Sequence, residues 1–146
     1  MRILGIDYGE ARVGVAITDE LNITAQGLET INRDGSDKVI LRRLDEILKK
    51  YEIETIVVGL PLNMNGTISK RAEITEQFIH KLKCKYNKIK IETIDERLTT
   101  IEAHKTMNFL NINKNKKKNI VDTISAVYIL ETYLNKQKNT LQNNLK

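Results

Sequence analysis

A chain of 146 residues, with 40% hydrophobic and 29% charged residues, is expected to form one domain around one hydrophobic core. Its formal charge of +5 is compatible with an anionic partner without identifying one, and no apolar run approaches the roughly 20 residues of a membrane span. The single cysteine, Cys84, excludes an intrachain disulfide. The opening segment is too short and wrongly flanked for a signal peptide, so we expect a cytoplasmic protein without a membrane partner.

The first part of the chain predicts three strands in a meander. Apolar or β-rich segments cover residues 3–6, 13–17 and 23–31. Short turns that contain glycine, asparagine or acidic residues separate them, as in hairpins.

The middle of the chain changes to helical spacing and then alternates. Apolar residues recur every three or four positions over 36–51, which predicts a helix, and a short buried strand over 55–60 ends at Pro61, the only proline. A second helix carries Phe78 on its apolar face, and residues 88–94 form a fifth strand.

The last part of the chain predicts two more helices. Thr99 and Glu102 form a capping box that opens the first of them. Residues 111–119 read as a polar, lysine-rich connection, and a final helix covers about 120–134. Residues 136–146 are too polar to bury much surface, so we expect a frayed tail. The element order is βββαβαβαα.

Acidic residues stand at the ends of apolar segments in three places. Asp7 follows the first strand, the pair Asp95 and Glu96 follows the fifth, and Asp122 lies near the start of the last helix. Ionised carboxylates avoid apolar surroundings unless something positive compensates them, and carboxylate oxygens suit hard cations such as Mg²⁺ or Mn²⁺. The pattern favours a metal-dependent hydrolase of a nucleic-acid backbone.

Each of these acids also has an ordinary structural interpretation, which the sequence leaves open. Asp7 fits a turn of the Asp-x-Gly type, and Asp122 fits an acid at a helix amino end, where the dipole favours it. Adjacent residues of an extended strand point to opposite faces, so only one of Asp95 and Glu96 can join Asp7.

Four motifs occur in a fixed order along the chain. They are Gly5-Ile6-Asp7-Tyr8-Gly9 followed by Arg12-Val13-Gly14-Val15-Ala16, then Val58-Gly59-Leu60-Pro61-Leu62-Asn63, then Asp95-Glu96-Arg97-Leu98-Thr99-Thr100, and finally Val121-Asp122. This set resembles the YqgF/RuvX family of pre-16S rRNA nucleases and Holliday-junction resolvase-like proteins, over about residues 1–135.

The resemblance implies an α/β, ribonuclease H-like fold: a five-stranded mixed sheet with helices on both faces, formed by a nuclease domain over 1–135. In that family the proposed catalytic set is the first-strand aspartate, an acid of the Asp-Glu-Arg block and the final-helix aspartate. These carry over to Asp7, to Glu96 or Asp95, and to Asp122. We expect a two-ion site of Mg²⁺ or Mn²⁺ in which Asp7 bridges the ions and Glu96 and Asp122 complete their shells.

Basic residues near these acids are candidates for phosphate contact. The family commonly has a lysine-arginine pair before its second strand, and here only the arginine of that pair is present. The connection before the last helix is usually basic in the family, and four lysines fill it here. Solvated charge is the ordinary alternative for these lysines, as it is for Arg71, and a role in holding its loop is the alternative for Arg97. The predicted substrate-binding residues are Arg12, Arg71, Arg97, Lys116, Lys117 and Lys118.

The function expected from the resemblance is processing of the 5′ end of precursor 16S rRNA in ribosome biogenesis. A Holliday-junction resolvase-like DNA endonuclease and a non-catalytic RNA-binding assembly factor remain alternatives, and so does the actin and sugar-kinase superfold, whose phosphate loop also uses Asp-x-Gly. Trimming an RNA end needs one active site whereas resolving a junction favours two, so both a monomer and a homodimer stay open.

Overall fold

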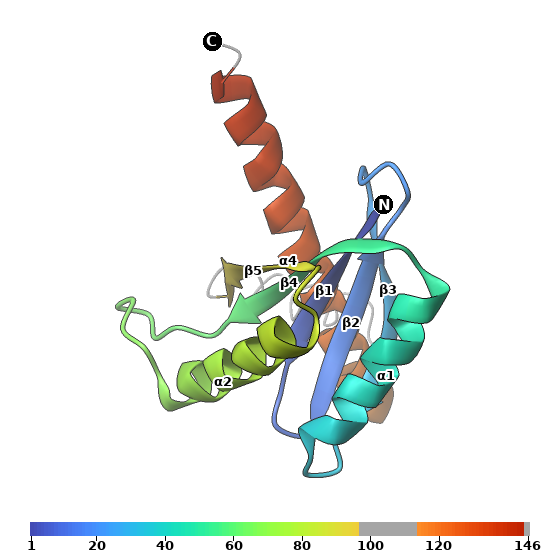
Figure 1. The fold of residues 1–146 in the computed structure, drawn as a ribbon. Coiled ribbons are helices and arrows are strands. Elements are labelled where there is room, and N and C mark those ends of the chain that lie inside the picture. The colour runs from blue at the N-terminus through green and yellow to red at the C-terminus, as the bar shows by residue number, and fades with distance from the viewer. Residues whose placement is uncertain (97–113, 145–146) are drawn as a thin grey trace.

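The computed structural model describes residues 1–96 and the helical backbone of 114–144, with side chains for 123–141 of that helix. Figure 1 shows its arrangement. The elements are β1 (Arg2–Tyr8), β2 (Arg12–Thr18), β3 (Ala25–Asn32), α1 (Asp37–Lys50), β4 (Ile53–Leu60), α2 (Lys70–Lys85), β5 (Lys90–Asp95) and α4 (Lys114–Asn144). The five predicted strands and the first two predicted helices are therefore present.

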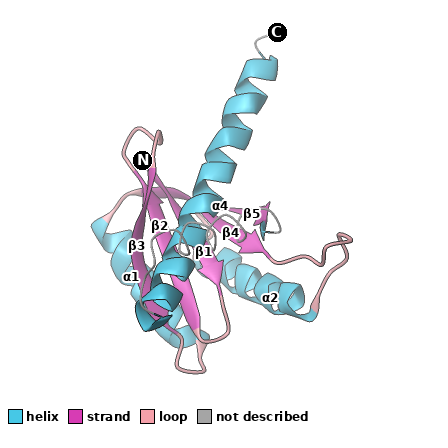
Figure 2. Ribbon diagram, turned by 180° about the vertical axis from the view of Figure 1, so that it is seen from behind, coloured by secondary structure: helices cyan, strands magenta, loops and turns pink. Residues whose placement is uncertain are grey.

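The five strands form one mixed sheet in the order β3-β2-β1-β4-β5. The meander β1-β2-β3 is antiparallel, whereas β4 pairs parallel to β1 and β5 pairs parallel to β4. Since consecutive side chains of a strand point to opposite faces, each strand feeds two cores. In β1, Leu4 and Ile6 belong to the core beneath α1 and α2, and Ile3 belongs to the core beneath α4. The predicted helices on both faces are confirmed, as Figure 2 shows from the α4 side.

The helices on the α1 and α2 side begin at serine caps. The Ser36 hydroxyl accepts a hydrogen bond from the backbone N–H of Lys38, and the Ser69 hydroxyl accepts one from that of Ala72. Such caps satisfy backbone donors that the first helical turn leaves unpaired. The apolar face predicted from the spacing in α1 is buried, for example at Leu44.

Glycines in the strands let α4 approach the sheet closely. A Cβ added at Gly5 would lie 2.5 Å from Cγ of Leu130 and 3.0 Å from the carbonyl oxygen of Ala126. One added at Gly27 would lie 2.1 Å from Cγ2 of Thr123. Because real Cβ atoms do not tolerate such separations, these strand positions must lack side chains for α4 to pack where it does.

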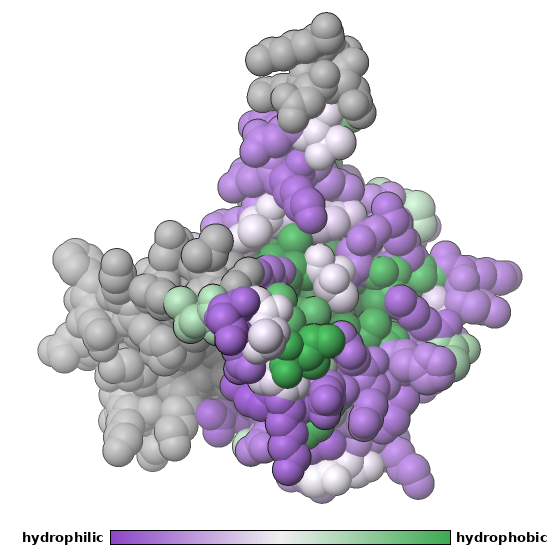
Figure 3. Space-filling view, turned by 90° about the vertical axis from the view of Figure 1, so that its left-hand side faces the viewer, coloured by the Kyte–Doolittle hydropathy of each residue, from purple (hydrophilic) through white to green (hydrophobic). Residues whose placement is uncertain are grey.

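The last helix is longer at both ends than the sequence predicted. The segment 114–119, predicted as a connection, and the segment 136–144, predicted as a frayed tail, both continue α4. Extending a helix that packing has already nucleated costs little, and lysine and glutamine favour helices. The expected lack of burial is nevertheless found, since residues 135–141 are exposed. Figure 3 shows this projecting part as mostly hydrophilic.

The helix predicted from the capping box at Thr99, together with Arg97, lies outside the described residues. Among the helices that the structure describes, none is both long and apolar enough to cross a membrane.

A buried carboxylate ties β1, α1 and α2 together at one end of the sheet. Asp37, whose side chain is 10% exposed, accepts hydrogen bonds from the Tyr8 hydroxyl (2.5 Å), Arg33 Nε (2.9 Å) and Lys81 Nζ (2.7 Å). Burial alone raises the pKa of Asp37, but the hydrogen bonds from Lys81, Tyr8 and Arg33 outweigh it and hold the pKa below its ordinary value.

Replacing this carboxylate should make the protein less stable in a pH-dependent way. We expect Asp37→Asn to lower the free energy of unfolding by about 1–3 kcal/mol near neutral pH, because three donors lose a charged acceptor. Since the folded-state pKa is depressed, the contribution is present above the ordinary value of 3.8 and is lost as the pH falls through the lower folded value. Urea denaturation across this range, with exposed Asp34→Asn as the control, checks both parts. An equal difference at neutral and acidic pH would contradict the assignment.

Candidate functional site

The carboxyl ends of three parallel strands meet at one edge of the sheet. The β1–β4 register pairs Ile6 with Val58, so the next residues, Asp7 and Gly59, lie beside each other. Leu60 at the end of β4 pairs with Asp95 at the end of β5. In open α/β sheets, ligands bind outside this end of the strands, so the predicted acids converge where a site is expected.

Glu96 is the member of the acidic pair that reaches Asp7. It follows the last residue of β5, is 8% exposed, and lies on the same face as Ile94, which packs beneath α4. A Cβ added at Gly59 would lie 3.3 Å from Cδ of Glu96, so the missing side chain leaves room for this carboxyl group. Asp95 ends the strand, half-buried, on the other side of the alternation.

Asp7 and Glu96 are close enough for the protonated form of the Asp7 carboxyl group to donate a hydrogen bond to Glu96. The pKa of Asp7 is raised well above its ordinary value, first by burial, then by this hydrogen bond and by repulsion from the Glu96 charge. The positive charge of Arg71 acts in the opposite direction. Without a further cation, two carboxylates in this position cannot both be ionised at little cost.

The donor set suits a hard divalent cation. Asp7 and Glu96 offer carboxylate oxygens, the ligands that Mg²⁺ and Mn²⁺ accept, and no nitrogen or sulfur ligand joins them among the described side chains. Asp122 lies within the helix α4, one helical turn before Ala126, whose carbonyl oxygen packs against Gly5. Its side chain lies outside the described part of the chain.

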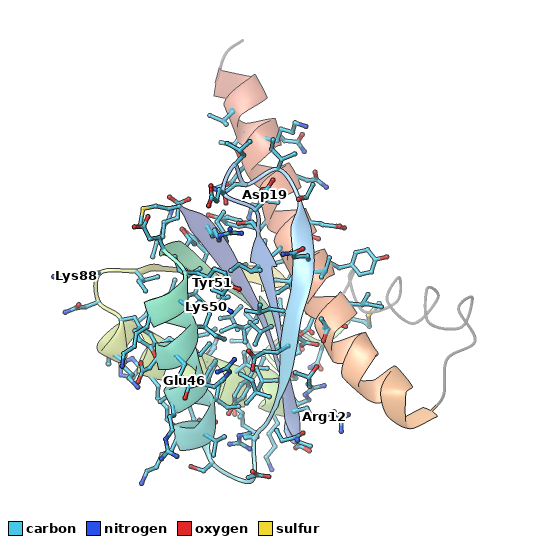
Figure 4. The ribbon with its side chains drawn as sticks, turned by 90° about the vertical axis from the view of Figure 1, so that its right-hand side faces the viewer. Arg12, Asp19, Glu46, Lys50, Tyr51 and Lys88 are labelled. Atoms are coloured by element: carbon cyan, nitrogen blue, oxygen red, sulfur yellow. The ribbon has the colours of Figure 1, made fainter. Side chains whose placement is uncertain are left out.

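Two predicted phosphate-binding residues come together although 59 positions separate them in the sequence. Arg12 opens β2 and Arg71 lies in the first turn of α2, and both line a groove of about 310 Å³ with Gly9, Glu10 and Ala11. Figure 4 shows Arg12 at one end of the sheet, opposite Asp19. A Cβ at Gly9 would lie 2.5 Å from the Arg12 carbonyl oxygen, so glycine permits the tight turn that sets Arg12 here.

Arg71 is a basic residue whose charge acts directly on the acids. Its guanidinium is exposed, forms no ion pair with any side chain that the structure describes, and lowers the pKa of Asp7 through its charge. The side chains of Lys116, Lys117 and Lys118, like Arg97, lie outside the described residues, although the lysines are within the helix α4.

Sequence reasoning missed a second cavity, of about 380 Å³, that adjoins this groove. Tyr8, Gly9 and Glu10 form its β1 side and Ile74, Thr75 and Gln77 its α2 side, with Arg33 and Arg71 completing it. Tyr8 and Gly9 belong to the first motif and Arg71 was a predicted phosphate contact, but no motif marked Glu10, Arg33, Ile74, Thr75 or Gln77, because these residues meet only through the packing of α2 on the sheet.

The chain is similar to known proteins along nearly its whole length. The model of the RuvX family, described as Holliday junction resolvase, matches residues 1–136. The chain belongs to the RuvX family. A relative from Ruminiclostridium cellulolyticum is 54% identical to this chain over 136 residues, which cover 93% of this chain and 95% of the relative. One from Acetivibrio thermocellus is 47% identical over 141 residues, which cover 97% and 100%. Each is named "Putative pre-16S rRNA nuclease".

Solved structures confirm the ribonuclease H-like fold. The fowlpox virus Holliday junction resolvase superposes with a TM-score of 0.57 at 15% identity, covering 94% of this chain and 99% of that one. RuvC of T. thermophilus in complex with Holliday junction substrate gives 0.50 at 12% identity, covering 90% and 96%. The family and its relatives confirm the expectation that the chain is a nuclease, a hydrolase of phosphodiester bonds.

The strained acid pair predicts an unusual response to mutation. We expect Asp7→Asn, measured in a chelator near neutral pH, to raise the free energy of unfolding by about 1 kcal/mol or more, because it removes a desolvated charge that repels Glu96. Thermal and urea denaturation beside Asp34→Asn, an exposed acid, measure the effect. A less stable Asp7→Asn protein would show instead that the fold itself stabilises this carboxylate.

Proposed function

We propose that this RuvX protein cleaves the 5′ leader of precursor 16S rRNA in the cytoplasm with the help of divalent cations. The observation that carries the proposal is the pairing of Asp7 and Glu96 at the carboxyl edge of the sheet, in a place where burial and mutual repulsion call for a cation. The substrate rests on the relatives, which share up to 54% identity and the name of a precursor rRNA nuclease.

Asp7 and Glu96 would hold the cation, and Asp122 is proposed to complete the set from α4. The bound cation supplies Lewis-acid activation of water and stabilises charge on the phosphate oxygens. A two-ion site of Mg²⁺ or Mn²⁺ is our proposal, supported by the carboxylate oxygens that Asp7 and Glu96 offer as ligands.

The chain's own groups account for holding the substrate. Arg71 presents an exposed guanidinium beside the acids, and such a group can hold a phosphate with two parallel hydrogen bonds. Arg12 borders the same groove from β2. Positive charge on this side brings the polyanionic strand to the acids, which would otherwise repel it. We propose that Arg97 and the lysines Lys116, Lys117 and Lys118 extend this contact.

A four-way DNA junction is the second candidate substrate, because the family description itself names a Holliday junction resolvase. That activity favours two active sites presented together, hence a homodimer. A non-catalytic RNA-binding assembly factor is the third candidate. It would use the same groove to bind RNA but would not cleave it.

The deciding experiment is cleavage of an end-labelled 16S rRNA leader and of a four-way DNA junction with Mg²⁺ or Mn²⁺. We expect the wild type to cut the RNA, and Asp7→Asn and Glu96→Gln to lose at least about 100-fold in kcat/KM, since each removes a cation ligand. Asp95→Asn is the matched comparison and should keep most activity, because Asp95 points away from Asp7.

Four results would change the proposal. Selective cutting of the junction would reassign the substrate to DNA. Loss of activity in Asp95→Asn alone would reverse the choice between the two acids. Binding of RNA without cleavage under any cation would leave an assembly factor, and activity that persists in all variants would reveal a contaminating nuclease.

Arg71 should contribute to binding through phosphate contact. We expect Arg71→Ala to weaken binding of the RNA leader about five- to tenfold and to reduce the slope of log K against log salt by about 0.7–0.9, the value of one phosphate contact. Fluorescence anisotropy at several salt concentrations gives both quantities. Arg42→Ala, an exposed arginine on α1 away from the groove, is the control. An unchanged slope in Arg71→Ala would contradict a phosphate contact.

A further inference from the structure

The cavity between the β1–β2 turn and α2 has the composition of a small-molecule site. Its volume of about 380 Å³ lies at the lower end of the range for ligand pockets, about 300–1,000 Å³, which suits one nucleoside and not a base pair. Ile74 and the Tyr8 ring, which stacks on Phe78 at 4.2 Å between centroids, give it apolar walls.

Three polar side chains on this cavity are available to a ligand. The Glu10 carboxylate, the Gln77 amide and the Arg71 guanidinium are exposed, and none forms a hydrogen bond or ion pair with a side chain in the described part of the chain. The other polar members are already engaged. Thr75 donates to the Arg71 carbonyl oxygen at 2.9 Å, and Arg33 donates to Asp37 at 2.9 Å.

The cavity lies close to the acid pair, because Tyr8 on its wall follows Asp7 in the chain and Arg71 lines both the cavity and the neighbouring groove. Tyr8 directly follows Asp7 in β1, but its side chain points to the opposite face of the sheet. The cavity and the carboxylates therefore lie on opposite faces at the same end of the sheet. Arg71 lines both this cavity and the adjoining groove that Arg12 borders. A phosphate at Arg71 would therefore lie where the cavity meets the groove.

We propose that this cavity binds one unpaired nucleotide of the strand that is cut, with its base between Ile74 and Gln77 and its phosphate at Arg71. The inference rests on the proposed nuclease function and extends it to substrate selection. An amide that offers both a donor and an acceptor is suited to a base edge, and apolar walls are suited to base faces. A base that is already paired has its edge occupied and is stacked on its neighbours, so the cavity selects unpaired nucleotides next to the cleaved bond.

Direct binding of mononucleotides tests the proposal without any cleavage. The full-length, isotope-labelled protein is titrated in a chelator with nucleoside 5′-monophosphates, ribose 5-phosphate and inorganic phosphate, and backbone amide shifts are followed by NMR. We expect the monophosphates to bind at least about tenfold more tightly than ribose 5-phosphate and to shift the amides of Gly9, Ile74 and Gln77. Inorganic phosphate should perturb only the surroundings of Arg71.

Variants locate the base within the cavity. We expect Gln77→Ala to weaken monophosphate binding about three- to tenfold, the range for one hydrogen bond, and to leave ribose 5-phosphate unaffected. Gln26→Ala, an exposed glutamine on β3, is the matched control and should bind as the wild type does.

The outcomes separate this inference from the nuclease assignment. Equal affinity for ribose 5-phosphate and the monophosphates, shifts confined to other surfaces, or no shifts at about 10 mM ligand would overturn the nucleotide site, whatever the cleavage assay shows. Base-dependent binding that Gln77→Ala weakens would establish the site even in a protein that cuts neither RNA nor DNA.

Discussion

Two carboxylates that a fold holds side by side, away from bulk water, repel each other and lose hydration. Asp7 and Glu96 are in that position, and most local features of this sheet edge follow from it. Parallel pairing of β1, β4 and β5 brings the strand ends together, and Gly59 leaves space for Ile129 of α4 and, beside it, for the Glu96 carboxyl. Arg71 supplies the nearby positive charge that partly offsets the repulsion.

Such a site costs stability, which the rest of the domain must supply. Two cores on opposite faces of the sheet do so, one beneath α1 and α2 and one beneath α4. The α4 core gains from its close approach over Gly5, where dispersion contacts replace a side chain. The hydrogen-bonded Asp37 shows the contrast, because a carboxylate with three donors stabilises the fold whereas the carboxylate of Asp7 strains it.

The sequence predicted those parts of the structure that local pattern controls. Alternation and helical spacing located β1 to β5, α1 and α2. Strand parity predicted that only one of Asp95 and Glu96 could reach Asp7, and in the structure Glu96 lies beside Asp7. Which of the two it is depended on where β5 ends relative to Gly59, a tertiary fact. The length of α4 was underestimated because polarity indicates exposure and does not exclude helix. The cavity around Gln77 was not predicted as a site, since its walls come from segments about 65 residues apart.

The position of Glu96 just after an edge strand has a consequence for how the protein moves. β5 has six residues and, among the described strands, pairs with β4 alone, so its detachment would break fewer contacts than opening of β1 or β2. Partial opening of this kind lies at the low end of the free-energy scale of native-state fluctuations. It would separate the two acids while the central strands stay intact, so amides in β5 should exchange hydrogen sooner than those in β1. A cation held by both Asp7 and Glu96 would stabilise β5 against this opening. It would slow hydrogen exchange in β5, so the order of this strand would depend on whether the site is occupied.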